Sequence, residues 1–297
     1  VGNNFFYTKS LPCSLWFFDK SKREELRNKV LFIDARNYYT VVDRTLNEWS
    51  EWQLKNLNAI VWLYRGETEK YTALTKEYVV EITLHLKQLA SSMEDLERDF
   101  GAFGAPLSAF RTEILHIAGN NGMIPFCNAI PVLEDYKKAI SKQMRQIEAE
   151  IAALDRKDIK AYLLRTFHTG ERWASCKKKL AQTVKDMTAP VVEEGPVETC
   201  IMLIREHDWL REKFEDETEG IHYRDIPGLC KVATLEEIEA KGYSLTPGAY
   251  VGVAPTEDDG VDFHERMTEI HQELLSLQAE SNRLMETISK NWEEMGL

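Results

Sequence analysis

The sequence has few cysteines, and their spacing excludes two common uses of that residue. It contains five cysteines in 297 residues, and no two of them form a C-x-x-C pair. Structural zinc sites need paired cysteines or histidines at short spacing, and disulfide frameworks need an even and dense set. None of the seven histidines forms an H-x-x-x-H pair. We therefore expect a protein of a reducing compartment, the cytoplasm, with no metal site.

Long uncharged hydrophobic runs are also scarce. The longest stretch without Asp, Glu, Lys or Arg covers residues 114–133, and Asn120, Pro125 and Pro131 interrupt it. These turn-forming residues predict a connection between helices rather than a membrane span, so we expect no membrane partner. No basic-then-apolar leader is present. Because the chain begins at Val1 rather than at Met, we expect a fragment or a processed chain.

Motifs for nucleotide binding or acyl transfer are missing. The sequence has no P-loop and no G-x-S-x-G motif. Gly101 and Gly104 in DFGAFGAP follow a helical pattern, whereas a Gly-rich cofactor loop leaves a strand and opens a helix. We therefore expect a turn between two helices at this place. The paired carboxylates Glu193–Glu194 and Asp258–Asp259 lie in polar linkers, where we expect them to be solvated.

Acidic residues outnumber basic ones, but their distribution is uneven. The formal net charge is -12, which argues against a free-standing DNA-binding domain. Residues 134–186 carry 13 basic and 8 acidic residues, a net charge of +5, whereas residues 187–297 carry 9 and 25, a net charge of -16. The middle segment is therefore suited to face a polyanion, and phosphate would repel the last third.

The basic segment contains a candidate phosphate-facing cluster. Lys177, Lys178 and Lys179 follow Arg172, and the aromatic Trp173 lies among them. A helix with several basic residues can follow a DNA backbone without reading bases. A solvated helix surface explains the same pattern equally well, so both interpretations remain open.

The hydrophobic pattern predicts a mostly α-helical fold, with long helices after an N-terminal β-hairpin. Leu11–Phe18 (LPCSLWFF) and Lys29–Ile33 (KVLFI) predict two short buried strands, which suit the edge of a larger sheet. Two strands alone are marginal in water. Thr234 with Glu237 forms a capping box, and Gly242 is a helix stop. Helices are expected at about 48–63, 70–99, 107–118, 132–154, 158–186 and 198–214.

A final helix, over about 261–294, has the sharpest periodicity. Apolar residues at alternating spacings of four and three form a heptad seam. The seam consists of Phe263, Met267, Ile270, Leu274, Leu277, Leu284 and Ile288, with Ser281 at the remaining position. We expect the seam to dock on long helices of a partner or another domain; an ordinary bundle helix of this chain is the alternative.

Three stretches together resemble the modification subunit of type I restriction–modification enzymes. The first is NFFYTKSLPCSLWFF (residues 4–18), followed by LFIDAR (31–36). The second, DIPGLCKVATLEEIEAKGYSLTPGAYVGV (225–253), resembles the family's C-terminal signature, and the third is the terminal helix with its closing N-W-E-E-M-G. The middle, about 68–216, resembles the family much less, so we expect a helical insertion. Ala249 stands where the family usually carries Arg.

The resemblance implies a domain organisation and an activity. Residues 1–47 would be the last strands of a Rossmann-like methyltransferase sheet, residues 48–222 a helical region, and residues 223–297 a tail with the docking helix. The family's modification subunit transfers a methyl group from S-adenosylmethionine to N6 of an adenine flipped out of double-stranded DNA. Its implied partners are a specificity subunit and a restriction subunit.

The family's catalytic and cofactor motifs are absent from this chain. It lacks the Gly-rich loop after the first strand and the Asn-Pro-Pro-aromatic motif. The resemblance therefore carries over no catalytic, cofactor-binding or metal-binding residue. We expect the chain alone to be inactive and to bind no S-adenosylmethionine, which would bind the full-length subunit. A non-enzymatic helical adaptor is the alternative function.

Overall fold

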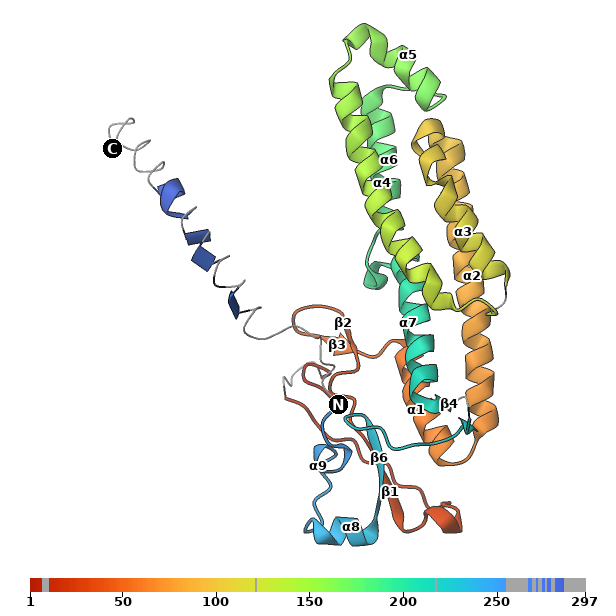
Figure 1. The fold of residues 1–297 in the computed structure, drawn as a ribbon, viewed down its shortest axis with the longest axis vertical. Coiled ribbons are helices and arrows are strands. Elements are labelled where there is room, and N and C mark those ends of the chain that lie inside the picture. The colour runs from red at the N-terminus through yellow and green to blue at the C-terminus, as the bar shows by residue number, and fades with distance from the viewer. Residues whose placement is uncertain are drawn as a thin grey trace. The chain divides into compact units, whose positions relative to one another are not determined.

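The protein is described here by a computed structural model. It describes residues 1–6, 11–120, 122–216 and 218–254, and then residues 267–268, 271, 274–275, 277–278 and 281–285. The chain forms two compact units, Val1–Val253 and Ala254–Leu297. The first unit contains the helices and strands named below (Figure 1).

Helices dominate the first unit. They are α1 (Glu51–Tyr64), α2 (Thr68–Phe100), α3 (Ser108–Gly119), α4 (Ala129–Ala152), α5 (Arg156–Thr166), α6 (Trp173–Met187), α7 (Pro196–Phe214), α8 (Leu235–Ala240) and α9 (Gly248–Val251). The strands are β1 (Lys29–Ile33), β2 (Thr40–Val41), β3 (Asn47–Glu48), β4 (Glu215–Asp216), β5 (Gly220–Ile221) and β6 (Cys230–Thr234). The mostly helical fold predicted from the sequence is confirmed, whereas the described residues contain only two-stranded sheets and no Rossmann sheet.

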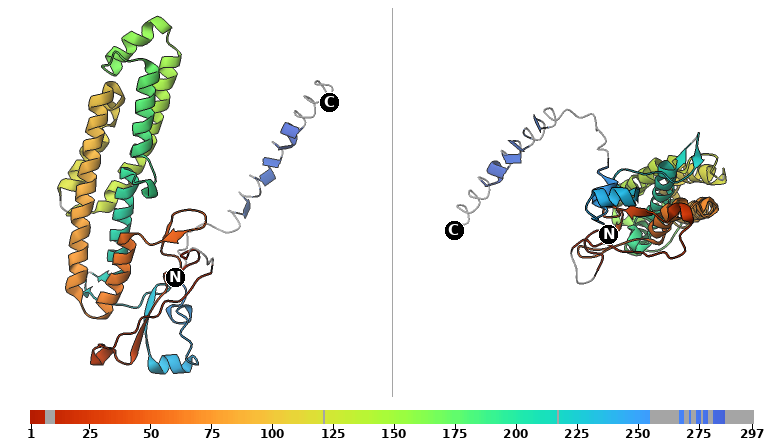
Figure 2. Two further views of the ribbon diagram at one scale, coloured as in Figure 1. Left: turned by 180° about the vertical axis from the view of Figure 1, so that it is seen from behind. Right: turned by 90° about the horizontal axis from the view of Figure 1, so that it is seen from below.

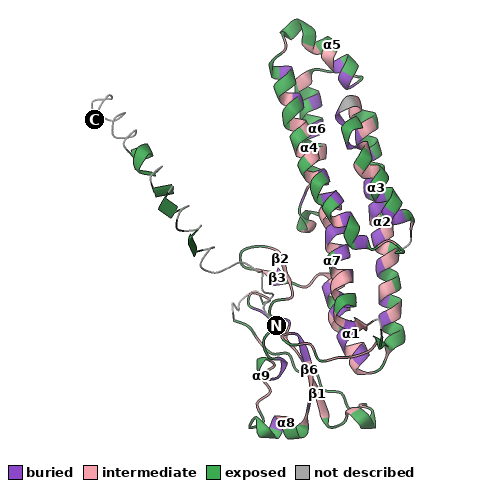
Figure 3. Cartoon of the chain, viewed as in Figure 1, coloured by how far each residue is buried: buried purple, intermediate pink, exposed green. Residues whose placement is uncertain are grey.

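The long helices pack into one bundle around a shared core (Figures 1 and 2). In α2 the buried residues recur every three or four positions, from Tyr71 through Tyr78 and Ile82 to Leu96, so one face of the helix points inward. This face packs against α1, α3 and α7, and α4 packs against α3, α6 and α7. Buried and exposed residues accordingly alternate along each helix (Figure 3).

One predicted helix is divided in the structure. The pattern over 158–186 predicts a single helix, but α5 ends at Thr166 and α6 begins at Trp173. His168 between them has a left-handed backbone, with φ of 51°, and Gly170 follows it. A continuous helix cannot contain that conformation. The buried Phe167 packs against Phe100 and Trp173, and these contacts hold the segment between α5 and α6 against the bundle.

The two ends of the first unit meet in a small antiparallel sheet. Strand β1 pairs with β6 over five residues, from Lys29 opposite Thr234 to Ile33 opposite Cys230. Alternate side chains of a strand face opposite ways. Leu31 and Ile33 therefore pack on the helical bundle, while Phe32 packs with α8 and α9. The ring of Phe32 stacks on Tyr250, with centroids 4.1 Å apart and planes 4° apart.

The predicted hairpin of Leu11–Phe18 with Lys29–Ile33 is wrong. Residues 11–18 have no regular secondary structure, and β1 pairs with the distant β6. A strand needs a neighbour for its backbone hydrogen bonds, and among the described residues only Val1 provides one, at Cys13. Its large side chains are exposed; Phe17 is 90% and Phe18 87% exposed.

The short helix α8 begins with the predicted capping box. The Thr234 hydroxyl accepts a hydrogen bond from the backbone N–H of Glu237, and the Glu237 carboxylate accepts one from the backbone N–H of Thr234. Thr234→Ala should lower the free energy of unfolding by about 1 kcal/mol, because the backbone N–H of Glu237 loses its acceptor. Chemical denaturation measures the change. Glu239→Ala, which leaves this cap intact, is the control, and an equal loss in both variants would contradict the capping role.

The described part of the terminal helix belongs to the second unit. Met267, Leu274, Leu277 and Leu284 of the predicted seam lie in helical segments and are about half exposed or more. Phe263, Ile270 and Ile288 lie outside the described residues. No helix among the described residues is long and apolar enough to span a membrane.

Candidate nucleic-acid and subunit interfaces

The four cations predicted to face DNA lie at the start of α6 and are all exposed. Two are already paired: Lys177 Nζ lies 3.2 Å from Glu148 Oε1 of α4, and Lys179 Nζ lies 2.6 Å from Glu171 Oε1. The hydrogen bond from Lys179 lowers the pKa of the Glu171 carboxyl. Lys178 and Arg172 have no acidic partner among the described residues. The structure therefore brings the cluster together but neutralises half of it.

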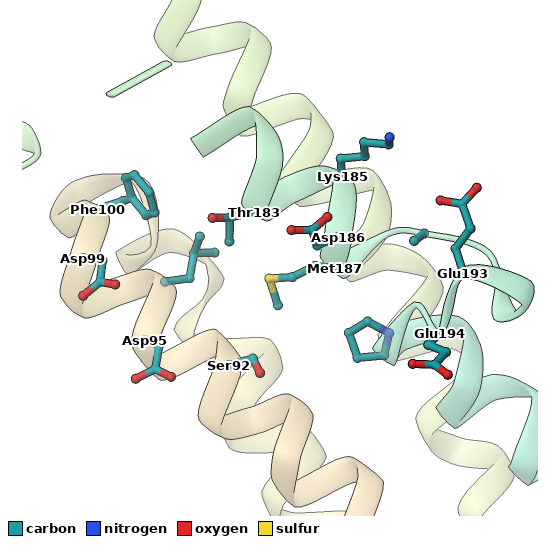
Figure 4. Close-up of a pocket in the computed structure, with 13 residues that line it drawn as sticks. Ser92, Asp95, Asp99, Phe100, Thr183, Lys185, Asp186, Met187, Glu193 and Glu194 are labelled. Carbon is teal, nitrogen blue, oxygen red and sulfur yellow. The ribbon is translucent and has the colours of Figure 1, made fainter. Parts of the chain in front are cut away.

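A groove of about 510 Å³ separates α6 from α2, and its rim is acidic (Figure 4). Asp95 and Asp99 of α2 face Asp186 of α6 across it, and Glu193 and Glu194 lie at its other end. The side chain of Lys185 points away from Asp95 and Asp99 in this view. This excess of carboxylates disfavours an anionic ligand in the groove.

The glycines of DFGAFGAP do not form a cofactor cradle. Gly101 begins the first of two 3₁₀ turns between α2 and α3, and Gly104 connects the two turns, so the predicted helix-to-helix turn is confirmed. A Cβ on Gly101 would lie 2.5 Å from the carbonyl oxygen of Thr166, and one on Gly104 would lie 2.4 Å from Cα of Glu97. Because the protein's own backbone fills both spaces, these residues do not fit the phosphate or nucleoside part of a cofactor. No group of metal-ligating side chains is present among the described residues either.

A cluster of polar side chains, the Glu206 cluster, connects α7 to α1, α2 and the loop after β1. The Glu206 carboxylate accepts hydrogen bonds from Tyr38 Oη, from Gln53 Nε2 (3.1 Å) and from Asn56 Nδ2 (3.1 Å). Tyr78 Oη in turn donates to Asn56 Oδ1 (2.9 Å). Gln53 and Asn56 are buried. The cluster therefore joins segments that are far apart in the sequence.

Burial dominates the electrostatics of the Glu206 cluster. It raises the pKa of the Glu206 carboxyl, and the hydrogen bonds from Tyr38, Gln53 and Asn56 only partly offset that increase. Burial also raises the pKa of Tyr38, with the charge of Glu206 adding to the effect. The Tyr38 ring stacks on Trp209 of α7, with centroids 4.4 Å apart. The arrangement holds helices together, because every polar group in it is directed at another.

Residues 225–253, the segment predicted from the sequence to be a C-terminal signature, lie against the LFIDAR segment (residues 31–36). The backbone N–H of Asp34 donates to the carbonyl of Leu229 (2.7 Å), and the N–H of Gly228 donates to that of Val251 (2.8 Å). Burial alone would raise the pKa of Asp34, but hydrogen bonds from Arg36 lower it overall. Ala249 has no polar side chain; its backbone carbonyl accepts a hydrogen bond from Lys241 Nζ, and its N–H donates to the carbonyl of Thr246. Segments 200 residues apart therefore form one structure.

A comparison with protein families shows what the N-terminal segment is similar to. Residues 1–85 match the model of the N-6 DNA Methylase family. The predicted resemblance is thus confirmed for this part of the chain, which includes β1, α1 and the first half of α2. The N-6 DNA Methylase match ends at residue 85, so the likeness of residues 225–253 to the family's C-terminal signature stays a prediction.

Two curated relatives show the same partial homology. The chain is 46% identical over 74 residues to the type I restriction enzyme HindI methylase subunit of Haemophilus influenzae, a match of 25% of this chain and 17% of that protein. It is 44% identical over 69 residues to the type I restriction enzyme MjaIX methylase subunit of Methanocaldococcus jannaschii, 23% of this chain and 12% of that protein. The chain therefore spans less than a fifth of either relative. No solved structure is significantly similar to it.

Sequence reasoning missed two features, the Glu206 cluster and the acidic groove. The cluster had a readable signal, because Gln53 and Asn56 are polar residues three apart on the face of α1 that the apolar pattern points inward. The groove had no signal in the sequence, since α2 and α6, which line it, are more than seventy residues apart.

Proposed function

We propose that the chain is the C-terminal part of the modification subunit of a type I restriction–modification enzyme. The observation that carries this proposal is the match of residues 1–85 to the N-6 DNA Methylase family. The complete subunit would transfer a methyl group from S-adenosylmethionine to adenine N6 in DNA. This chain would form the C-terminal end of the catalytic domain, bind the specificity subunit and contribute contacts to DNA.

The exposed segment Leu11–Phe18 supports an incomplete domain. Leu11, Trp16, Phe17 and Phe18 expose large apolar surfaces, which a stable protein rarely leaves in water as one continuous segment. These residues lie within the family match, and the chain spans only 17% and 12% of the two relatives. We infer that the remainder of the methyltransferase domain covers them and completes a sheet against β1.

The cofactor and the target adenine would bind in that remainder. The spaces beside Gly101 and Gly104 are filled by the chain's own backbone, and the Asn-Pro-Pro motif is absent from the sequence. S-Adenosylmethionine supplies the methyl group when it is bound to the complete subunit. The residues of this chain would have a structural role in the complete subunit. The β1–β6 sheet and the Glu206 cluster connect the helical bundle to the family-matched segment.

A titration with radiolabelled S-adenosylmethionine tests the proposal. The chain alone should bind no cofactor, whereas a protein extended upstream by the residues that precede Val1 in its gene should bind it and methylate adenine in DNA when the specificity subunit is present. An extended protein that binds no cofactor would contradict the proposal and favour the helical adaptor. Binding by the 297-residue chain alone would contradict the placement of the cofactor site.

A further inference from the structure

One face of the bundle carries cations that the described acidic residues leave unpaired. Lys142 and Arg145 of α4 and Lys178 of α6 are exposed and have no partner among the described residues. We call these three residues the α4–α6 face. By contrast, Lys137, Lys138, Lys177 and Lys179 in the same helices each pair with a carboxylate.

The packing of α4 against α6 places the three cations on one side. Tyr136 Oη lies 3.4 Å from Met187 Sδ, and Glu148 pairs with Lys177. From the first contact to the second, the residue number rises by 12 in α4 (136 to 148) and falls by 10 in α6 (187 to 177). The two helices therefore run antiparallel and in contact, as Figures 1 and 2 also show. In this register Arg145 lies within about one turn of Lys178 along the pair.

The direction of each side chain follows from its neighbours on the helix. In α4, Ile140 and Ile147 are buried and Glu148 points at α6, so the exposed Lys142 and Arg145, three residues apart, share the outward side. In α6, Cys176 and Leu180 are buried and Lys177 points at α4. The exposed Lys178 is left on the outward side as well.

No carboxylate interrupts the facing stretches of the two helices. Residues 137–147 of α4 contain no Asp or Glu, and neither do residues 173–185 of α6. Asp186, the acidic residue within α6, lies in the groove with Asp95 and Asp99 of α2. Helix α6 therefore separates a positive face from a negative groove, and a polyanion can approach from one side only.

We propose that the α4–α6 face binds the phosphate backbone of double-stranded DNA, as an accessory contact of the bundle rather than a base-reading site. This inference rests on the proposed function, because that function brings DNA to the complex. The face extends about 5 Å along α4 between Lys142 and Arg145 at 1.5 Å per residue, and duplex DNA presents about three phosphate charges over that length. It offers long, exposed cations without a cavity, which suits backbone contacts that carry no sequence information.

The test is the salt dependence of DNA binding by the whole 297-residue chain. A variant with Lys142→Gln, Arg145→Gln and Lys178→Gln is compared with the unchanged chain on a labelled 30-base-pair duplex, by fluorescence anisotropy. We expect the slope of log K against log salt to fall in magnitude by about 3, roughly 0.9 per phosphate contact. Between 50 and 200 mM salt, the affinity of the unchanged chain should then fall about 40-fold more than that of the variant.

A matched control distinguishes an effect of the α4–α6 face on DNA binding from an effect of net charge. Lys20, Lys76 and Lys87 are exposed lysines without a described acidic partner, outside the α4–α6 face. The triple change of these residues to Gln removes the same charge and should alter the slope by less than about 1. An equal loss in the control, or an unchanged slope in the α4–α6 variant, would overturn the inference. So would binding of polyglutamate in place of DNA, which would assign the face to an acidic protein.

The outcome is distinguishable from failure of the proposed function. DNA binding through the face is measured on the chain alone, without cofactor or specificity subunit. If the slope falls as expected but the extended protein binds no S-adenosylmethionine, the face is a DNA contact and only the methyltransferase proposal fails. If the extended protein methylates DNA while the slope is unchanged, only the inference about the face fails.

Discussion

Leu274→Asp combined with Leu277→Asp should abolish co-purification of the chain with the specificity subunit. Both leucines lie on the predicted heptad seam, in described helical segments of the second unit, and are 60% and 58% exposed. Burial of each against a partner helix would contribute roughly 1.5–3 kcal/mol. Losing both therefore lowers the affinity by at least about 100-fold, since every 1.4 kcal/mol is a factor of ten. Placing two carboxylates in an apolar seam adds a desolvation cost.

Leu275→Asp is the matched control for the seam. Leu275 is 57% exposed, but it follows a seam position and lies on the outer side of the helix in the heptad pattern. The same substitution there should leave co-purification unchanged. Retention of the specificity subunit by the double variant would refute seam docking, and loss in both variants would show that helix formation rather than the seam is affected. Circular dichroism of the variants reports helix content independently.

Helices were predictable from the sequence because their signal is local. The apolar spacing of α2 and α7 predicts their bounds to within a few residues, and the capping box predicts the start of α8. The break between α5 and α6 was missed, since an apolar pattern continues across it while His168 leaves the helical conformation. Propensity does not reveal a left-handed residue that tertiary contacts stabilise.

Pairings between distant segments were not predictable in the same way. Leu11–Phe18 has the composition of a buried strand, but composition does not say whether a partner strand is present, and the described residues provide none. Strand β1 instead pairs with β6, about 200 residues later, and no local pattern specifies that partner. The lysines of α6 illustrate the same point: the sequence predicts their exposure, but only the fold shows that Glu148 neutralises Lys177.

These long-range contacts join the helical bundle to the family-matched segment, residues 1–85. Residues 1–85 supply β1, Tyr38, Gln53, Asn56 and Tyr78, whereas Glu206 and β6 come from residues outside the match. The bundle is therefore joined to the segment by a sheet on one side and by a buried polar cluster on the other. A helical region joined in this way retains a fixed orientation, which a DNA contact on the α4–α6 face requires.

Glu206→Ala should destabilise the first unit by about 2–5 kcal/mol. Removing the carboxylate leaves the buried Gln53 Nε2 and the Tyr38 hydroxyl without their acceptor, and each unsatisfied donor costs about 1–3 kcal/mol. Chemical denaturation measures the loss. Tyr38→Phe, which removes one donor and keeps the carboxylate, should cost about 1.5 kcal/mol. Glu212→Ala, on the exposed side of the same helix, should cost less than about 0.5 kcal/mol.

The pH dependence gives an independent measure of the same carboxylate. Because burial raises the folded-state pKa of Glu206, its protonated form is favoured in the folded protein. Its contribution to stability is therefore fully present below the unfolded pKa, near 4.5, and is lost as pH rises through the raised folded pKa. The side chain in Glu206→Gln cannot ionise, so the free energy of unfolding of this variant should lack the loss. The difference in unfolding free energy between the unchanged chain and the variant should therefore change over this pH range. Parallel pH profiles of the unchanged chain and the Gln variant, or an unchanged denaturation midpoint in Glu206→Ala, would show that the cluster does not hold α7 to the family-matched segment.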